Sequence, residues 1–80
     1  MKATVQRIYP ESRTGLINWI EQKFHDIDQY IVTFAMKDGT TVTVYDTYSF
    51  FNAMGLCGVQ TDVIQRLNSD GEFKAKERSE

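Results

Sequence analysis

Residues 30–45 constrain the fold most, because they carry the pattern of a β-hairpin. β-branched and aromatic residues fill two runs, 30–36 and 41–45, and residues of these types favour strands. Between the runs, Lys37-Asp38-Gly39-Thr40 contains the Asp-Gly dipeptide that favours a type I′ turn. The pattern therefore predicts an antiparallel hairpin, and side-chain alternation gives it a core face. That face consists of Tyr30, Val32, Phe34 and Met36.

A strand and a helix are predicted before the hairpin. The run 3–9 is rich in strand-forming residues and ends at Pro10. In the segment 16–24, apolar residues recur at the helical spacing i, i+4 and i+8, which favours a helix capped by Ser12 or Thr14. The competing interpretation of that segment is a second strand after a turn at residues 13–15.

The part of the chain after the hairpin is less constrained. A short helix over 50–54 is expected to start at a cap chosen from Asp46, Thr47 and Ser49 and to end at Gly55. For the last third, two interpretations stay open. Residues 61–68 form a helix, or strands 62–67 and 72–75 form a hairpin whose turn contains Asp70-Gly71. Residues 76–80 are expected to be a frayed polar tail.

The order of these elements predicts an α+β fold. Because the chain has 80 residues, we expect one small domain over residues 1–75. Its antiparallel sheet would carry one or two short helices around the central hairpin 30–45. With a second hairpin at the end of the chain, the sheet would curl toward an SH3-like or OB-like barrel.

Charge and cysteine content narrow the classes of function. Nine basic and eleven acidic residues give a net charge of −2, which is too balanced for a polybasic nucleic-acid binder. The single cysteine, Cys57, excludes an intrachain disulfide framework and fits the reducing cytoplasm. With neither a signal peptide nor a membrane span expected, the sequence suggests a cytoplasmic accessory protein of a bacterium or phage.

Few residues have the chemistry of a catalytic or metal site. His25 has Asp26 and Asp28 beside it, but a metal site needs three or four convergent ligands. Cys57 is expected to be a small buried apolar residue rather than a nucleophile. We therefore predict no catalytic residue, no metal site, no cofactor and no small-molecule substrate.

A nucleic-acid-binding regulator is the second hypothesis for function. The spacing of Gly58, Val59, Ile64 and Leu67 within 53–67 resembles a repressor-type helix-turn-helix motif. The resemblance implies a DNA-facing set made of Gln60, Thr61, Gln65 and Arg66. Met54, where such motifs usually have alanine, and Asp62, an acidic residue on the DNA side, depart from the pattern.

A second nucleic-acid surface is predicted near the N-terminus. The runs 5–9 and 15–17 loosely resemble the opening strands of a cold-shock domain, over less than a quarter of the chain. The resemblance implies stacking of single-stranded bases on aromatic residues beside basic ones. The candidates are Arg7, Tyr9, Arg13 and Trp19.

Aromatic residues close together in the sequence support the first hypothesis, a protein-binding surface. Phe50 and Phe51 are adjacent and cannot both point inward from one helix face. At least one of them, with Tyr45 or Tyr48, is expected at the surface, and exposed aromatic clusters mark interfaces. The sequence thus predicts a small non-enzymatic module that docks on a protein partner or on a second copy of itself.

Overall fold

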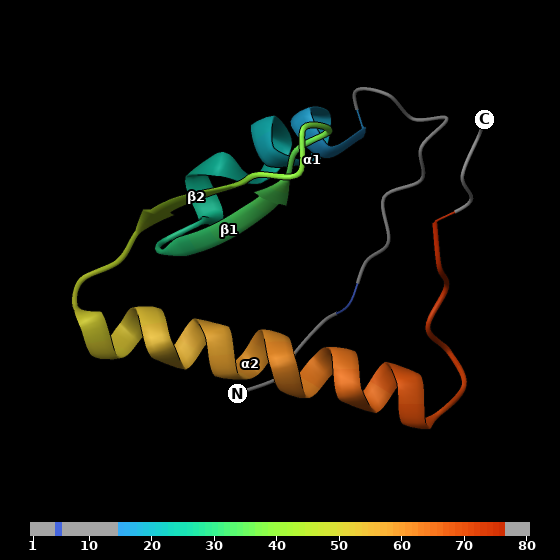
Figure 1. Ribbon diagram of the computed structural model, residues 1–80. Coiled ribbons are helices and arrows are strands. Elements are labelled where there is room, and N and C mark those ends of the chain that lie inside the picture. Colours follow the sequence, from blue (N-terminus) through green and yellow to red (C-terminus); the bar gives the residue numbers. More distant parts are fainter. Residues whose placement is uncertain (1–4, 6–14, 77–80) are drawn as a thin grey trace.

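A two-stranded antiparallel sheet and two α-helices make up the part of the chain that the structure describes (Figure 1). The computed structural model describes residue 5 and residues 15–76. The elements in chain order are α1 (Gly15–Lys23), the 3₁₀-helix η1 (Phe24–Asp26), β1 (Tyr30–Ala35), β2 (Thr41–Asp46) and α2 (Phe50–Ser69). The fold is α+β, as predicted. The expectation of a barrel is wrong, because the two described strands form an open sheet.

The hairpin forms with the predicted strands but with a different turn. Its register pairs Tyr30 with Asp46. At the turn the Met36 N–H donates to the Thr40 carbonyl at 2.8 Å. A type I′ turn needs positive φ at two residues, and among the described residues only glycines have it, with Gly39 at 89°. The turn is therefore a three-residue loop whose glycine lies in the left-handed region, the arrangement that accompanies a bulge.

Asp38 stabilises this turn with its side chain. Its Oδ1 accepts hydrogen bonds from the Thr40 backbone N–H at 3.0 Å and from Thr40 Oγ1 at 2.6 Å. These two bonds favour the charged carboxylate and hold the pKa of Asp38 below its ordinary value. Such a side-chain bond two residues along the chain is why aspartate is common in turns.

The Gly39→Ala substitution is expected to destabilise the hairpin. A Cβ at this position meets nothing within 4 Å, so the penalty comes from the backbone φ of 89° and not from a clash. A left-handed conformation costs an L-residue about 1–2 kcal/mol. Thermal unfolding followed by circular dichroism should show a lower midpoint. An unchanged midpoint would mean that the turn adopts another conformation in solution.

The first helix confirms one of the two interpretations of its segment. α1 is helical over Gly15–Lys23, so the alternative of a second strand is wrong there. The last turn continues into η1, and the Ile27 N–H donates to the Phe24 carbonyl at 3.2 Å. The predicted caps Ser12 and Thr14 lie outside the described residues. Of the predicted strand 3–9 only Val5 is described, and it is exposed and belongs to no strand.

The second helix is longer than predicted. α2 runs for 20 residues without interruption, so the predictions of a stop at Gly55 and of a terminal hairpin are wrong. The helical interpretation of residues 61–68 is confirmed. Among the described residues, no helix is both long enough and apolar enough to cross a membrane.

Both ends of α2 have recognisable caps. At the start, Ser49 Oγ accepts from the Asn52 N–H at 3.1 Å, which confirms Ser49 among the predicted caps. At the end, the Gly71 N–H donates to the Asn68 carbonyl at 3.2 Å and the Glu72 N–H to the Leu67 carbonyl at 2.9 Å. With Gly71 at a φ of 72°, these bonds form a Schellman motif. Asp70-Gly71 therefore ends a helix and does not turn a hairpin.

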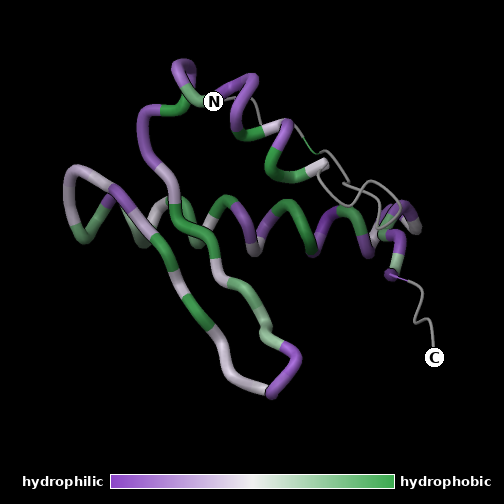
Figure 2. The backbone as a smooth tube through the Cα atoms, turned by 90° about the horizontal axis from the view of Figure 1, so that it is seen from above, coloured by the Kyte–Doolittle hydropathy of each residue, from purple (hydrophilic) through white to green (hydrophobic). Residues whose placement is uncertain are grey.

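The elements are arranged as an open assembly. The hairpin lies between α1 and α2 in Figure 1, and α2 packs mainly on β1. Figure 2 shows that the hairpin crosses α2 and that its turn projects beyond both helices. In the part of the chain that the structure describes, no side chain is buried. The predicted core face of the hairpin is thus only partly covered, with Phe34 39% and Met36 47% exposed.

Candidate functional site

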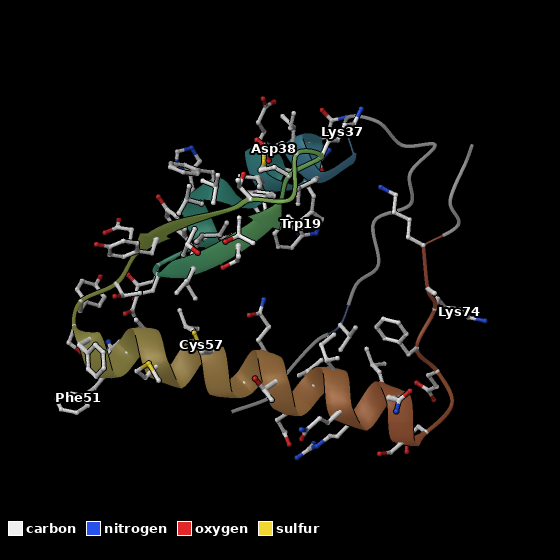
Figure 3. All side chains as sticks on the ribbon, viewed as in Figure 1. Trp19, Lys37, Asp38, Phe51, Cys57 and Lys74 are labelled. Carbon is white, nitrogen blue, oxygen red and sulfur yellow. The ribbon has the colours of Figure 1, made fainter. Side chains whose placement is uncertain are left out.

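Four aromatic side chains are exposed where β2 leads into α2. We call Tyr45, Tyr48, Phe50 and Phe51 the aromatic cluster; their exposed fractions lie between 69% and 81%. The sequence predicted that Phe50 and Phe51 could not both be inside, and both are outside. Figure 3 shows Phe51 pointing away from the sheet, whereas Cys57 on the same helix points toward it. The Phe50 and Phe51 rings stand edge to face, with centroids 5.7 Å apart.

Local hydrogen bonds fix the backbone that carries the aromatic cluster. Thr47 Oγ1 donates to the Ser49 carbonyl at 3.0 Å. Ser49 Oγ in turn caps α2, as described above, and contacts the Asn52 side chain at 3.0 Å. Because Phe50 and Phe51 follow this cap directly, their positions are set by the first turn of a well-capped helix.

A second set of hydrogen bonds ties this junction to the connector before β1. The Tyr48 hydroxyl donates to Asp28 Oδ1 at 2.5 Å. Gln29 Oε1 accepts from the Tyr48 backbone N–H at 3.1 Å and from Asn52 Nδ2 at 2.9 Å. The connector therefore holds both the loop and the first turn of α2. Sequence reasoning missed Asp28 and Gln29 as supports, because these partners are 19 to 23 residues away along the chain.

The hydrogen bond between the Tyr48 hydroxyl and Asp28 is expected to make Tyr48 lose its proton at a higher pH than an ordinary tyrosine. The hydrogen bond to Asp28 and the negative charge of its carboxylate both favour the neutral phenol, so the pKa of Tyr48 lies above its ordinary value of 10.0. A raised pKa contributes stability below the unfolded pKa, and that contribution is lost as pH rises through the folded pKa. An ultraviolet titration should lose one step in the Tyr48→Phe variant, and that step should lie above pH 10.0. A lost step below this pH would contradict the bond.

The residues predicted to read DNA lie on one continuous helix. No turn interrupts α2 at Gly58, so the helix-turn-helix arrangement is wrong. Arg66 Nη2 lies 3.0 Å from Asp62 Oδ2, an exposed ion pair one helical turn apart. Thr61 Oγ1 donates to the Cys57 carbonyl at 3.0 Å. Gln60 and Gln65 are exposed on the same helix.

Of the residues in the other predicted nucleic-acid surface, the structure describes only Trp19. This residue lies on α1, is half-buried and points toward the hairpin (Figure 3). Arg7, Tyr9 and Arg13 lie outside the described residues. The structure therefore does not place these four residues together, and the surface stays a prediction.

His25 and Asp28, the histidine and one of the aspartates considered above for acid–base or metal chemistry, have separate contacts. The His25 ring contacts the Phe24 ring edge to face at 6.1 Å, and Asp28 is engaged by Tyr48. Over the described ranges, no group of three or more histidine, cysteine, aspartate or glutamate residues could hold a metal ion. Cys57, expected to be buried, is half-buried against the sheet side of α2.

Comparison with known proteins identifies no relative of this chain. No family model, no curated protein and no solved structure matches the chain.

Proposed function

We propose that this chain is a non-enzymatic interaction module that docks on a protein through the aromatic cluster, as an accessory or inhibitor protein does. The observation that carries this proposal is the exposure of four neighbouring aromatic side chains in the range of 69% to 81%. We place the module in the cytoplasm, where its single cysteine stays reduced.

Aromatic side chains are effective anchors for a protein partner. Tyrosine and phenylalanine are enriched at interfaces, and a few such residues supply most of the binding energy. Leaving several of them together in water is unfavourable, at roughly 25 cal/mol for each Å² of apolar surface. A partner that covers the aromatic cluster removes this cost.

The hydrogen bonds at the β2–α2 junction support the same function. Tyr48 is hydrogen-bonded through both its hydroxyl and its backbone N–H, and Phe50 and Phe51 follow a capped helix start. An interface that is ordered before binding loses less conformational entropy when the partner arrives. The exposed polar groups of Asp46 and Asn52 lie beside the aromatic residues in the sequence and supply a polar rim.

Photo-crosslinking in cells tests this function. We would place benzoylphenylalanine at position 51, where it replaces an exposed aromatic residue, and at position 65 of the same helix as the matched control. A discrete protein adduct at position 51 and none at position 65 is the expected result. Equal adducts at both positions, or none at position 51, would overturn the proposal.

A further inference from the structure

We infer that the partner of the aromatic cluster is a second copy of this chain, bound through the outer edge of β2. This inference rests on the proposed function and names its partner. Two β2 strands would pair antiparallel about a twofold axis at Thr43 and make one four-stranded sheet from two hairpins. The argument combines the chemistry of the edge, its register and the apolar area that it would cover.

Among the described residues, no segment pairs with the outer edge of β2. All six residues of β2 are exposed, and residues 41–45 contain neither a charge nor a proline. Natural proteins usually protect such an edge with lysine, proline or a bulge, because it can pair with another strand. Figure 2 shows α1 on the β1 side of the hairpin, away from this edge.

The backbone groups that face outward from β2 can be assigned from the turn. The Met36 N–H bonds to the Thr40 carbonyl, and in an antiparallel ladder bonded and non-bonded pairs alternate. Thr41, Thr43 and Tyr45 therefore direct their N–H and C=O groups away from β1. The side chains of Thr33 and Thr43 agree with this assignment, because their hydroxyls meet at 2.9 Å across the closer, non-bonded kind of pair.

The β2 sequence is complementary to itself in this register. With Thr43 opposite its own copy, Thr41 faces Tyr45 and Val42 faces Val44 of the second chain. Asp46 then faces the uncharged Thr40, so no like charges meet. Pairs of β-branched and aromatic residues stabilise neighbouring strands, and a twofold contact uses the same residues on both copies.

The same register brings two exposed apolar surfaces together. We call Phe34, Met36, Val42 and Val44 the hairpin end; they are 39% to 47% exposed and line a shallow apolar hollow beside the turn. Antiparallel pairing places the hairpin end of one copy beside the β2–α2 junction of the other. Figures 1 and 2 agree that the first turn of α2, which begins at Phe50, projects past the end of β2.

The exposed apolar area is large enough for a stable dimer if most of it is covered. Large aromatic side chains each bury about 150–250 Å². At the exposed fractions given above, complete covering of the aromatic cluster and the hairpin end would remove at most about 800 Å² per copy from solvent. Standard stable interfaces bury about 800 Å² per partner. Because no described residue is buried within one chain, this contact would also supply the core that the single chain lacks.

Sedimentation equilibrium of the full chain and two lysine variants tests the inference. Thr43→Lys places two like charges at the twofold axis and should weaken dimerisation at least about 30-fold. Thr33→Lys is the matched control, because it loses the same 2.9 Å hydroxyl contact but lies on the other strand. It should remain a dimer. A monomeric unmodified chain, or equal dissociation constants for the two variants, would overturn the inference.

A second test uses only the unmodified chain, so that misfolding of a variant cannot affect its result. If two copies unfold together, the thermal midpoint of the unmodified chain rises with protein concentration. A midpoint that stays constant over a hundredfold range of concentration would overturn the inference.

The crosslinking experiment separates failure of this inference from failure of the proposed function. An adduct at position 51 with the mass of two chains supports both. An adduct with a different protein, from a chain that sediments as a monomer, overturns self-association and retains the interaction module. A dimer that gives no adduct at position 51 overturns both, because the aromatic cluster is then uncovered.

Discussion

Replacing Phe51 with aspartate is expected to weaken binding to the partner at least about 30-fold and to leave the fold intact. Truncating an aromatic anchor typically costs about 2 kcal/mol or more of binding free energy, and a charge at its position adds a desolvation cost. Phe51 is 81% exposed, and substitutions at exposed positions usually change stability by less than about 0.5 kcal/mol. Sedimentation for association and circular dichroism for folding would measure the two effects separately.

The control for this prediction is Gln65→Asp on the same helix. Gln65 is exposed and lies outside the aromatic cluster, and this variant adds the same charge to α2. It should bind as well as the unmodified chain. If Phe51→Asp unfolds the protein, Phe51 belongs to a core within one chain and the site assignment is wrong.

Replacing Gly55 and Gly58 with alanine is expected to stabilise the protein by about 1–2 kcal/mol in total. Glycine inside a helix is about 0.5–1 kcal/mol less favourable than alanine. A Cβ added at either position meets nothing within 4 Å, so no clash opposes the gain. For a chain of this size the thermal midpoint should rise by roughly 4–8 °C for each kcal/mol.

Gly71→Ala gives the opposite sign and serves as the control for the helix glycines. Gly71 ends α2 at a φ of 72°, where it also meets nothing within 4 Å. Alanine there should lower the midpoint, because a left-handed φ is unfavourable for alanine and the added Cβ makes no contact that would offset this cost. If Gly55→Ala and Gly58→Ala also lowered the midpoint, α2 would not be one continuous helix in solution.

The two Asp-Gly dipeptides show how far sequence patterns reach. Both glycines adopt positive φ, with Gly39 at 89° and Gly71 at 72°. The first lies between two alternating runs, and the hairpin was predicted there. The second follows a segment of mixed character and ends a helix. The dipeptide thus predicts a left-handed residue reliably, whereas the element around it depends on the flanking pattern.

The length of α2 could not be predicted from local signals alone. Glycine at two interior positions argued for a break, yet each costs only about 1 kcal/mol. Against this cost stands an apolar stripe along 20 residues of helix. Its half-buried members are Ala53, Leu56, Cys57, Val63 and Leu67. This spacing continues through both glycines and was the signal that could have found the helix.

The exposed aromatic residues of the candidate site could be predicted from the sequence, but the residues that hydrogen-bond to the β2–α2 junction could not. Two adjacent phenylalanines cannot share one helix face, so exposure of at least one followed from Phe50 and Phe51 alone. The roles of Asp28 and Gln29 depend on the fold bringing the connector beside the β2–α2 junction. Local patterns contain no such long-range information. The lack of buried residues in the described part of the chain was also unexpected. The composition, with 41% hydrophobic residues, is ordinary for a globular protein.

Hydrogen exchange at the Thr43 backbone N–H tests the central claim most directly. In one chain this group faces solvent, whereas in the paired form it bonds to the second copy. The account predicts slow exchange at high protein concentration and faster exchange on dilution. The Val44 N–H, which faces β1 in the alternation, reports whether the hairpin itself is formed. Fast exchange at Thr43 at every concentration, with Val44 protected, would contradict the account.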